Sequence, residues 1–197
     1  MESTSLRTCF APTVNRSAAM ILVVVVILGR GATPAAHAST DTWLWQNPLP
    51  QGNSVNAVSC TAPNWCKAVG DKGLLFAWDG ASWSIESSPT TASLRGVSCT
   101  STSQCKAVGS GGTVLSWDGS TWSVDANADS ADLNSVSCTS GSFCRAVGNG
   151  GAVRAWNGTA WSGEASGTTN VLSSVSCTDP TFCKAVCHDG VIVNSGM

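Results

Sequence analysis

Residues 97–109, with the sequence VSCTSTSQCKAVG, contain the pattern that decides the fold. The same pattern, Val-Ser-Cys followed by a short loop and then Cys-(Lys/Arg)-Ala-Val, occurs four times at a fixed interval of 39 residues. Self-similarity at a period of this length is typical of repeat architectures, in which each repeat is one supersecondary unit. The sequence therefore predicts a repeat protein.

Each repeat shows the period-two alternation and the turn residues that are typical of short β-strands. Asp79-Gly80, Asp118-Gly119 and Asn157-Gly158 lie between strands that carry tryptophans, and such dipeptides are strong hairpin signals. In the second repeat the predicted strands are 96–99, 105–108, 113–117 and 121–124. Four antiparallel strands in each repeat predict an all-β fold, a β-propeller of four blades with four strands each.

The two ends of the chain predict how the propeller closes. The fourth repeat stops at Met197, before its own fourth strand, whereas an additional strand, Asp41–Trp45, precedes the first repeat. Pairing this N-terminal strand beside residues 191–193 would complete the fourth blade and cover an exposed sheet edge. A β-trefoil fits less well because it needs three repeats, and an open solenoid would not need complementary ends. A fragment of a larger propeller stays open, because four blades is the low end of the known range.

The N-terminal segment predicts export. Residues 1–38 contain basic side chains, an apolar run over 18–28 and the small residues Ala36 and Ala38, as in a secretory signal peptide cleaved before Ser39. The apolar run is too short to span a bilayer, which needs about 20 apolar residues. We therefore expect residues 39–197 to form a secreted propeller, extracellular or at the cell surface, with no membrane span after the signal is removed. Its seven Lys/Arg and eleven Asp/Glu give no reason to expect nucleic acid as a partner.

In an oxidising compartment, evenly spaced cysteines are most simply disulfides. Structural zinc sites usually separate paired cysteines by two to four residues, whereas each pair here has five residues between its members. The predicted disulfides are Cys60–Cys66, Cys99–Cys105, Cys138–Cys144 and Cys177–Cys183. Cys187 is left over at the position of Gly70, Gly109 and Gly148; we interpret it as a small residue tolerated in a turn, with a reactive thiol as the alternative.

The repeats resemble those of secreted bacterial propeller proteins of the BNR type, and are distantly similar to photosystem II assembly-factor propellers. The resemblance rests on Val-Ser-Cys, Cys-Lys-Ala-Val-Gly and Trp-Asp-Gly-Ser-Thr-Trp, and it covers nearly all of residues 41–197. Residues 116–122 also resemble the Asp-box of sialidases, although the glycine and the final tryptophan each come one residue early. Asp-boxes are structural in that family, so this likeness implies a fold and not catalysis.

The residues argue against an enzyme. A sialidase-like site would need a tyrosine nucleophile, and the chain has no tyrosine. A Ser-His-Asp or Cys-His arrangement would have to use His188, the only histidine after residue 38, and its neighbour Cys187 should point away from it. A carboxylate pair for glycoside hydrolysis stays open, because the separation between acidic groups is not visible in a sequence. A carbohydrate-active hydrolase of the Asp-box type is therefore one alternative, and a structural or assembly factor is the other.

No cofactor is expected, and only one segment resembles a metal site. Asp125, Asn127 and Asp129 have the alternating oxygen ligands that begin a calcium loop. Ser130 stands where the loop needs glycine, and Val136 stands where it needs a bidentate glutamate. We interpret this segment as a solvated connection and expect no metal.

The second cysteine of each pair is flanked by residues that point to the face opposite the cysteine. Three repeats place an aromatic residue before this cysteine, all four place a base after it, and Gln104 takes the aromatic position in the second repeat. One interpretation is that the aromatics pack between blades while the bases extend to water. The functional hypothesis is a basic rim that binds an extracellular glycan or protein by stacking and cation–π contact. Its candidate residues are Trp65, Lys67, Lys106, Phe143, Arg145, Phe182 and Lys184.

Overall fold

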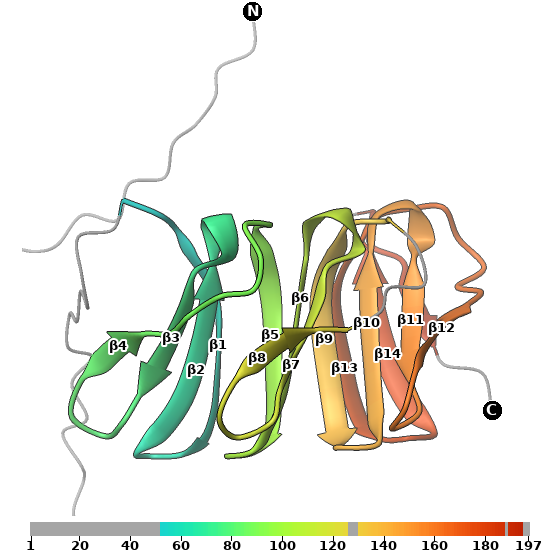
Figure 1. Ribbon diagram of the computed structural model, residues 1–197. Coiled ribbons are helices and arrows are strands. Elements are labelled where there is room, and N and C mark those ends of the chain that lie inside the picture. Colours follow the sequence, from blue (N-terminus) through green and yellow to red (C-terminus); the bar gives the residue numbers. More distant parts are fainter. Residues whose placement is uncertain (1–51, 126–129, 188, 195–197) are drawn as a thin grey trace, which may run out of the picture. The chain divides into compact units, whose positions relative to one another are not determined.

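The computed structural model describes residues 52–125, 130–187 and 189–194, all within one compact unit, Trp45–Met197. These residues form four antiparallel sheets in which consecutive strands are neighbours (Figure 1). The all-β, blade-like architecture predicted from the sequence is confirmed, and it is consistent with a four-bladed β-propeller. Sheet 1 contains β1 Val55–Ala62, β2 Trp65–Gly70, β3 Leu75–Trp78 and β4 Trp83–Ile85. Sheet 2 contains β5 Leu94–Ser101, β6 Gln104–Gly109, β7 Val114–Trp117 and β8 Trp122–Val124.

The remaining sheets repeat this order. Sheet 3 contains β9 Leu133–Ser140, β10 Phe143–Gly148, β11 Val153–Trp156 and β12 Trp161–Glu164. Sheet 4 has three strands among the described residues, β13 Leu172–Asp179, β14 Phe182–Cys187 and β15 Ile192–Asn194. Short 3₁₀ turns, Asp71–Gly73, Ser110–Gly112 and Asn149–Gly151, connect the second and third strands of the first three sheets.

Each disulfide joins the first two strands of one sheet. Cys99 lies directly opposite Cys105 in the register of β5 and β6, and their Cα atoms are 4.0 Å apart. The structure pairs the cysteines as the sequence predicts, with bonds Cys60–Cys66, Cys99–Cys105, Cys138–Cys144 and Cys177–Cys183. Cys187 is the free cysteine of the described chain, and it is buried at the end of β14. Its interpretation as a turn residue is therefore wrong, because Cys187 pairs in register with Leu172 of β13.

The hairpins between the third and fourth strands are held by one side chain each. Asp118 Oδ1 accepts hydrogen bonds from the backbone N–H groups of Ser120 and Thr121, both at 2.8 Å. Asp79 makes the same two contacts in sheet 1, and Asn157 makes them in sheet 3 through its amide oxygen. Such Asx turns let a short polar side chain take the place of a backbone acceptor.

We expect the Asp118 turn to weaken in acid. The N–H groups of Thr121 and Ser120 lower the pKa of Asp118 from 3.8 to about 2 because they stabilise the carboxylate. A depressed folded-state pKa contributes stability above pH 3.8, and this contribution is lost as the pH falls through about 2. Side-chain carboxyl NMR of Asp118 should therefore show a titration midpoint well below that of an unstructured aspartate. Asp118→Asn should keep the turn and remove this titration, as Asn157 shows, whereas a midpoint near 3.8 in the wild type would contradict the assignment.

Consecutive sheets pack face to face through their first strands. β5 lies against β1, β9 against β5 and β13 against β9, so that the sheets follow one another in chain order (Figure 1). Leu94 of β5 is buried in a cluster with Val69 and Leu75 of sheet 1. Leu133 of β9 is buried with Val108 and Val114 of sheet 2 in the same way. The core therefore consists of a repeated layer between neighbouring sheets.

Some sequence predictions lie outside the described residues. These are the signal peptide over 1–38, the closing strand Asp41–Trp45 and most of the calcium-loop candidate after Asp125. That the domain of four repeats begins at residue 39 also stays a prediction. Among the described residues, no helix has the length and apolar character that a membrane crossing requires.

Candidate functional site

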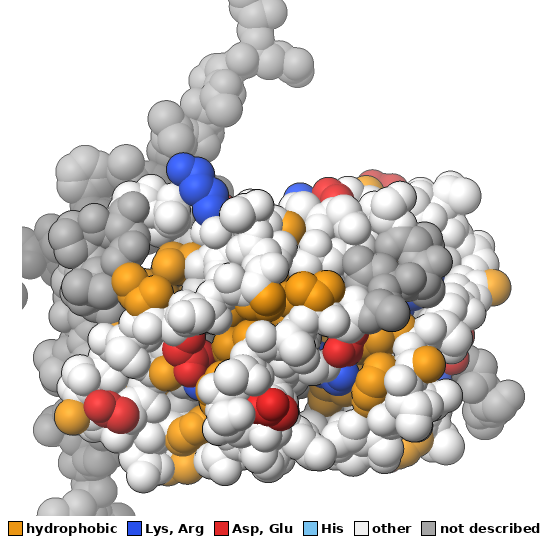
Figure 2. All heavy atoms as spheres, viewed as in Figure 1, with side chains coloured by type: hydrophobic (Ala, Val, Ile, Leu, Met, Phe, Trp, Pro, Cys, Tyr) orange, Lys and Arg blue, Asp and Glu red, His pale blue; other side chains and the backbone are white. Residues whose placement is uncertain are grey.

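The four bases of the predicted rim do not form an exposed ring. Lys67 is 2% exposed and Lys106 is 9% exposed, because each lies between two neighbouring sheets. On the face shown in Figure 2, Lys and Arg side chains are isolated spots and not a patch. The prediction of an exposed basic rim is therefore wrong for these two lysines, and so is the interpretation that they extend to water.

Lys67 joins sheet 1 to sheet 2 through a buried ion pair. Its ammonium contacts the carboxylate of Glu86, which follows β4 of the same sheet, and lies 3.6 Å from the ring centre of Trp117 in β7. Trp122 of β8 donates its indole N–H to the other oxygen of Glu86, at 2.9 Å. The charge is thus neutralised by a carboxylate and covered by an aromatic face, two interactions that gain strength away from water.

Lys106 repeats this arrangement between sheets 2 and 3. Its ammonium is 2.6 Å from Asp125 Oδ2 and 3.5 Å from the ring centre of Trp156. Trp161 donates its indole N–H to Asp125 at 3.0 Å. Asp125, which would have been the first ligand of the calcium loop, is therefore engaged by a lysine and a tryptophan.

The bases of the third and fourth repeats keep part of the arrangement. Arg145 forms an ion pair with Glu164, with 2.9 Å between Nε and Oε2, and its guanidinium lies 4.4 Å from the ring centre of Phe143. Lys184 donates to Asn194, and its ammonium is 4.8 Å from the ring centre of Phe182. In both repeats the base thus lies near the aromatic residue that precedes it by two positions in the same strand. Trp65 also lies near Lys67, with 5.2 Å between its ring centre and the ammonium.

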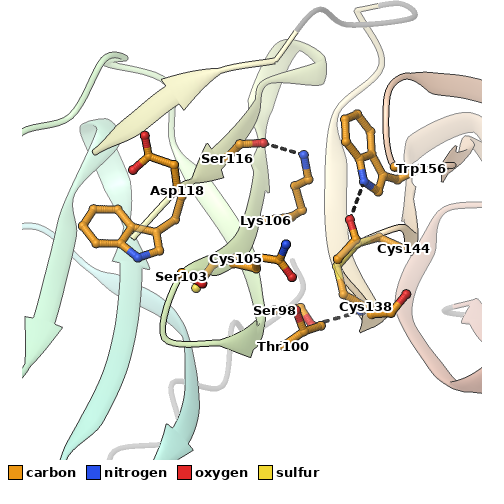
Figure 3. Close-up of a pocket in the computed structure, with 15 residues that line it drawn as sticks. Ser98, Thr100, Ser103, Cys105, Lys106, Ser116, Asp118, Cys138, Cys144 and Trp156 are labelled. Atoms are coloured by element: carbon orange, nitrogen blue, oxygen red, sulfur yellow. Dashed lines mark hydrogen bonds between the residues drawn. A yellow bond between two sulfur atoms is a disulfide. The ribbon is translucent and has the colours of Figure 1, made fainter. Parts of the chain in front are cut away.

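A pocket of about 370 Å³ opens between sheets 2 and 3, beside the disulfide loops and the hairpin turns. In Figure 3, Asp118 and Ser116 lie on one side and Trp156 on the other, with Lys106 between them. Hydroxyl groups, two indoles, an ammonium and two disulfides make up most of its wall. The lining residues are Ser98, Thr100, Ser103, Gln104, Cys105, Lys106, Ser116, Trp117, Asp118, Cys138, Ser140, Gly141, Cys144, Trp156 and Gly158.

The pocket coincides with a break in the repeat pattern. The residue before the second cysteine is Trp65, Phe143 or Phe182 in the other repeats but Gln104 here. Trp65 packs against the apolar cluster that sheet 1 shares with sheet 2. Gln104 instead lies against Gly141, so closely that a β-carbon added to this glycine would collide with the Gln104 amide. The smaller residues on both sides of this junction leave space that an aromatic ring fills between sheets 1 and 2.

The pocket has the chemistry of a binding site. Its hydroxyls can donate and accept hydrogen bonds, and the indole faces of Trp117 and Trp156 can contact apolar or planar groups. Asp118 accepts hydrogen bonds from the N–H groups of its own turn. These bonds keep its carboxylate ionised and already use its Oδ1 atom. Within the described residues, no group of three or more His, Cys, Asp or Glu could hold a metal ion.

The sequence prediction missed both the acidic partners and the pocket. A periodic signal for the partners does exist, because Glu86, Asp125 and Glu164 each follow the base of their repeat by 19 residues. The only sequence signal for the pocket is Gln104 itself, the one polar residue at an otherwise aromatic position. Of the predicted site residues, Lys106 lines this pocket, whereas Arg145 lines a separate one, of about 220 Å³, between sheets 3 and 4.

Comparison with solved structures identifies propellers of the same fold. A structure of YCF48 bound to D1 peptide superposes with a TM-score of 0.59 at 18% identity, covering 74% of this chain and 52% of that chain. YCF48 from Cyanidioschyzon merolae gives a TM-score of 0.56 at 16% identity, covering 77% and 56%. The fold is that of these photosystem II assembly-factor propellers, which confirms the distant similarity predicted from the repeats.

The chain spans about half the length of these two structures. No protein-family profile matches the sequence, and no curated protein is significantly similar to it. Sequence identities below one fifth establish the shared fold and carry no activity across, because one fold serves many functions.

Proposed function

We propose that this protein is a secreted, non-catalytic β-propeller that binds a peptide segment of another protein in the pocket between sheets 2 and 3. The observation that carries the proposal is the space beside Gln104, at the junction where the repeat pattern replaces an aromatic residue with a smaller polar one. The other three repeats carry an aromatic residue at this position, so the difference is local to one site.

The lining favours a peptide. A peptide backbone offers alternating donors and acceptors, which match hydroxyl groups such as those of Ser103 and Ser140, and its side chains can contact Trp156. Most ligand pockets combine apolar or aromatic contact area with a few polar groups that fix orientation, and this wall has both. One protein of similar fold is seen bound to a peptide, which supports the same class of ligand here.

The four disulfides support a location in an oxidising compartment. Export through residues 1–38 and an extracellular protein partner complete this proposal. A glycan is the alternative ligand of the same pocket, since sugars also use hydroxyl partners and indole faces. Lys67 and Lys106 contribute by joining neighbouring sheets, through their own carboxylate partners and the tryptophans of the next sheet, and not as an exposed charged surface.

The test uses peptide selection and one pair of matched variants. Peptides from a random phage-display library are selected on the secreted wild-type protein, with a glycan array screened in parallel. Gln104→Trp places the residue of the first repeat into the pocket that Gln104 lines, and should reduce affinity for the selected peptides at least about tenfold. Gln104→Ala enlarges the pocket and should leave most of the affinity.

Thermal unfolding of both variants controls for folding. Peptides that bind Gln104→Trp as tightly as the wild type would contradict the pocket as the binding site. Ligands found only on the glycan array, and lost in Gln104→Trp, would keep the pocket and replace the peptide with a glycan.

A further inference from the structure

The junction between neighbouring sheets is built three times from the same contacts. A leucine at the start of each new sheet enters the apolar cluster of the preceding sheet, as Leu94 does with Val69 and Leu75. A serine hydroxyl of one sheet accepts the backbone N–H of a cysteine in the next, as Ser59 Oγ does from Cys99 at 3.0 Å. The equivalent bonds from Cys138 to Ser98 and from Cys177 to Ser137 are also 3.0 Å long.

The first and fourth sheets each carry one half of this junction without the other. Val58 of β1 is 59% exposed, whereas its counterpart in the second repeat, Val97, is 8% exposed. Val186 of β14 is 39% exposed, whereas its counterpart in the third repeat, Val147, is 1% exposed. Ile192 of β15, at the position of Leu75, is exposed as well. Sheet 1 thus presents the face that receives a preceding sheet, and sheet 4 presents the face that receives a following one.

The polar groups of the two faces are also complementary: sheet 4 carries the serine acceptor of the junction, and sheet 1 carries the N–H donor. Ser176 occupies the position of Ser59, Ser98 and Ser137, and it is exposed. The corresponding donor on sheet 1 is the N–H of Cys60, as the donors in the three built junctions are cysteine N–H groups. The apolar and the hydrogen-bonding parts of the junction therefore both have counterparts on these two faces, with Val55 in place of the leucine.

The charged part of the junction is also divided between the two faces. Lys184 of sheet 4 stands at the position of Lys67 and Lys106, which lie over tryptophans of the next sheet. The tryptophan at the corresponding position of sheet 1 is Trp78. A sheet 1 placed against sheet 4 would bring this indole over Lys184.

We propose that a second copy of this chain provides the missing halves, so that sheet 4 of each copy packs against sheet 1 of the other. The two junctions close a head-to-tail ring of eight sheets. Within the described residues, extensive packing joins each sheet only to its neighbours in the chain, so sheets 1 and 4 each have one packed neighbour. The chain spans about half of two propellers of the same fold, so two copies supply a comparable amount of chain. Both interfaces reuse a junction that already exists three times, and they do not involve the peptide pocket.

The experiment measures the mass of the secreted full chain by sedimentation equilibrium, with three aspartate variants. The wild type should have the mass of two copies. Val58→Asp damages the face of sheet 1, Val186→Asp damages the face of sheet 4, and each variant alone should have the mass of one copy. Val124→Asp is the control, because Val124 is nearly as exposed as Val58 but lies in β8, away from both faces. This variant should keep the mass of two copies.

Mixing the two damaged variants distinguishes a head-to-tail junction from any other association. The intact sheet 4 of Val58→Asp matches the intact sheet 1 of Val186→Asp, so an equimolar mixture should again form a two-copy species, through one junction. Circular dichroism of each variant verifies that the exposed substitutions leave the sheets folded. A monomeric wild type, an open series of larger assemblies, or a dimer that persists in both Val58→Asp and Val186→Asp would overturn the proposal.

Discussion

Replacing Leu94 with alanine should lower the free energy of unfolding by about 2 to 5 kcal/mol. Leu94 is fully buried between sheets 1 and 2, where it contacts Val69 and Leu75. Its truncation removes apolar contact area and leaves a cavity, because the strands on both sides are fixed by their own sheets. Urea unfolding monitored by tryptophan fluorescence measures the change.

The repeat provides a matched control for Leu94. Val55 occupies the equivalent position in the first repeat but is 50% exposed, since no described sheet precedes it. In protein dilute enough to be monomeric, Val55→Ala should change the free energy of unfolding by less than about 0.5 kcal/mol. Equal losses for the two alanine variants would show that Val55 is buried within one chain, which would contradict the separation of sheets 1 and 4.

Replacing Lys67 with methionine should cost about 2 to 3 kcal/mol, although the substitution keeps an apolar chain of similar length. The loss arises because Glu86 stays between the sheets as a carboxylate without its cation. A fully buried pair would cost more, but the side chain of Glu86 retains 16% exposure. Lys72→Met makes the same substitution in an exposed turn and should have little effect.

A second substitution separates the ion pair from packing. Adding Glu86→Gln to Lys67→Met removes the unpaired charge while the amide oxygen still accepts the indole N–H of Trp122. The double variant should therefore recover more than half of the loss. If it is no more stable than Lys67→Met alone, the methylene chain of the lysine, and not its charge, joins these two sheets.

The strands were predictable because the signals for them are local. In the second repeat the predicted strand 113–117 is observed as Val114–Trp117, and the predicted strand 121–124 as Trp122–Val124. The turn between them depends on Asp118 and the two N–H groups that follow it, so a short stretch of sequence contains all the atoms involved. The disulfide register follows from the same locality, since each cysteine pair closes one hairpin.

The environment of the lysines could not be predicted in the same way. Alternation along a strand shows that Lys67 points to one face of its sheet, but not that Trp117 of another sheet covers that face. The pocket could not be predicted for the same reason, because it lies between residues of two different repeats, Gln104 and Gly141. A sequence shows that Gln104 differs from Trp65, whereas only the packing of two sheets shows that the difference creates a space.

The most direct test of the pocket is an NMR titration of the wild-type protein with a selected peptide, observed through the indole N–H signals. Trp117 and Trp156 line the pocket, and their indole N–H groups donate to the carbonyls of Thr102 and Gly141 at 3.0 and 2.9 Å. Trp78 makes the equivalent bond to Pro63 in sheet 1, away from the pocket, and serves as an internal control. Single Trp→Phe variants assign the three signals. If the pocket is the binding site, the Trp156 and Trp117 signals shift on titration while the Trp78 signal stays in place. Shifts confined to Trp78, or saturable binding that moves none of the three, would contradict it.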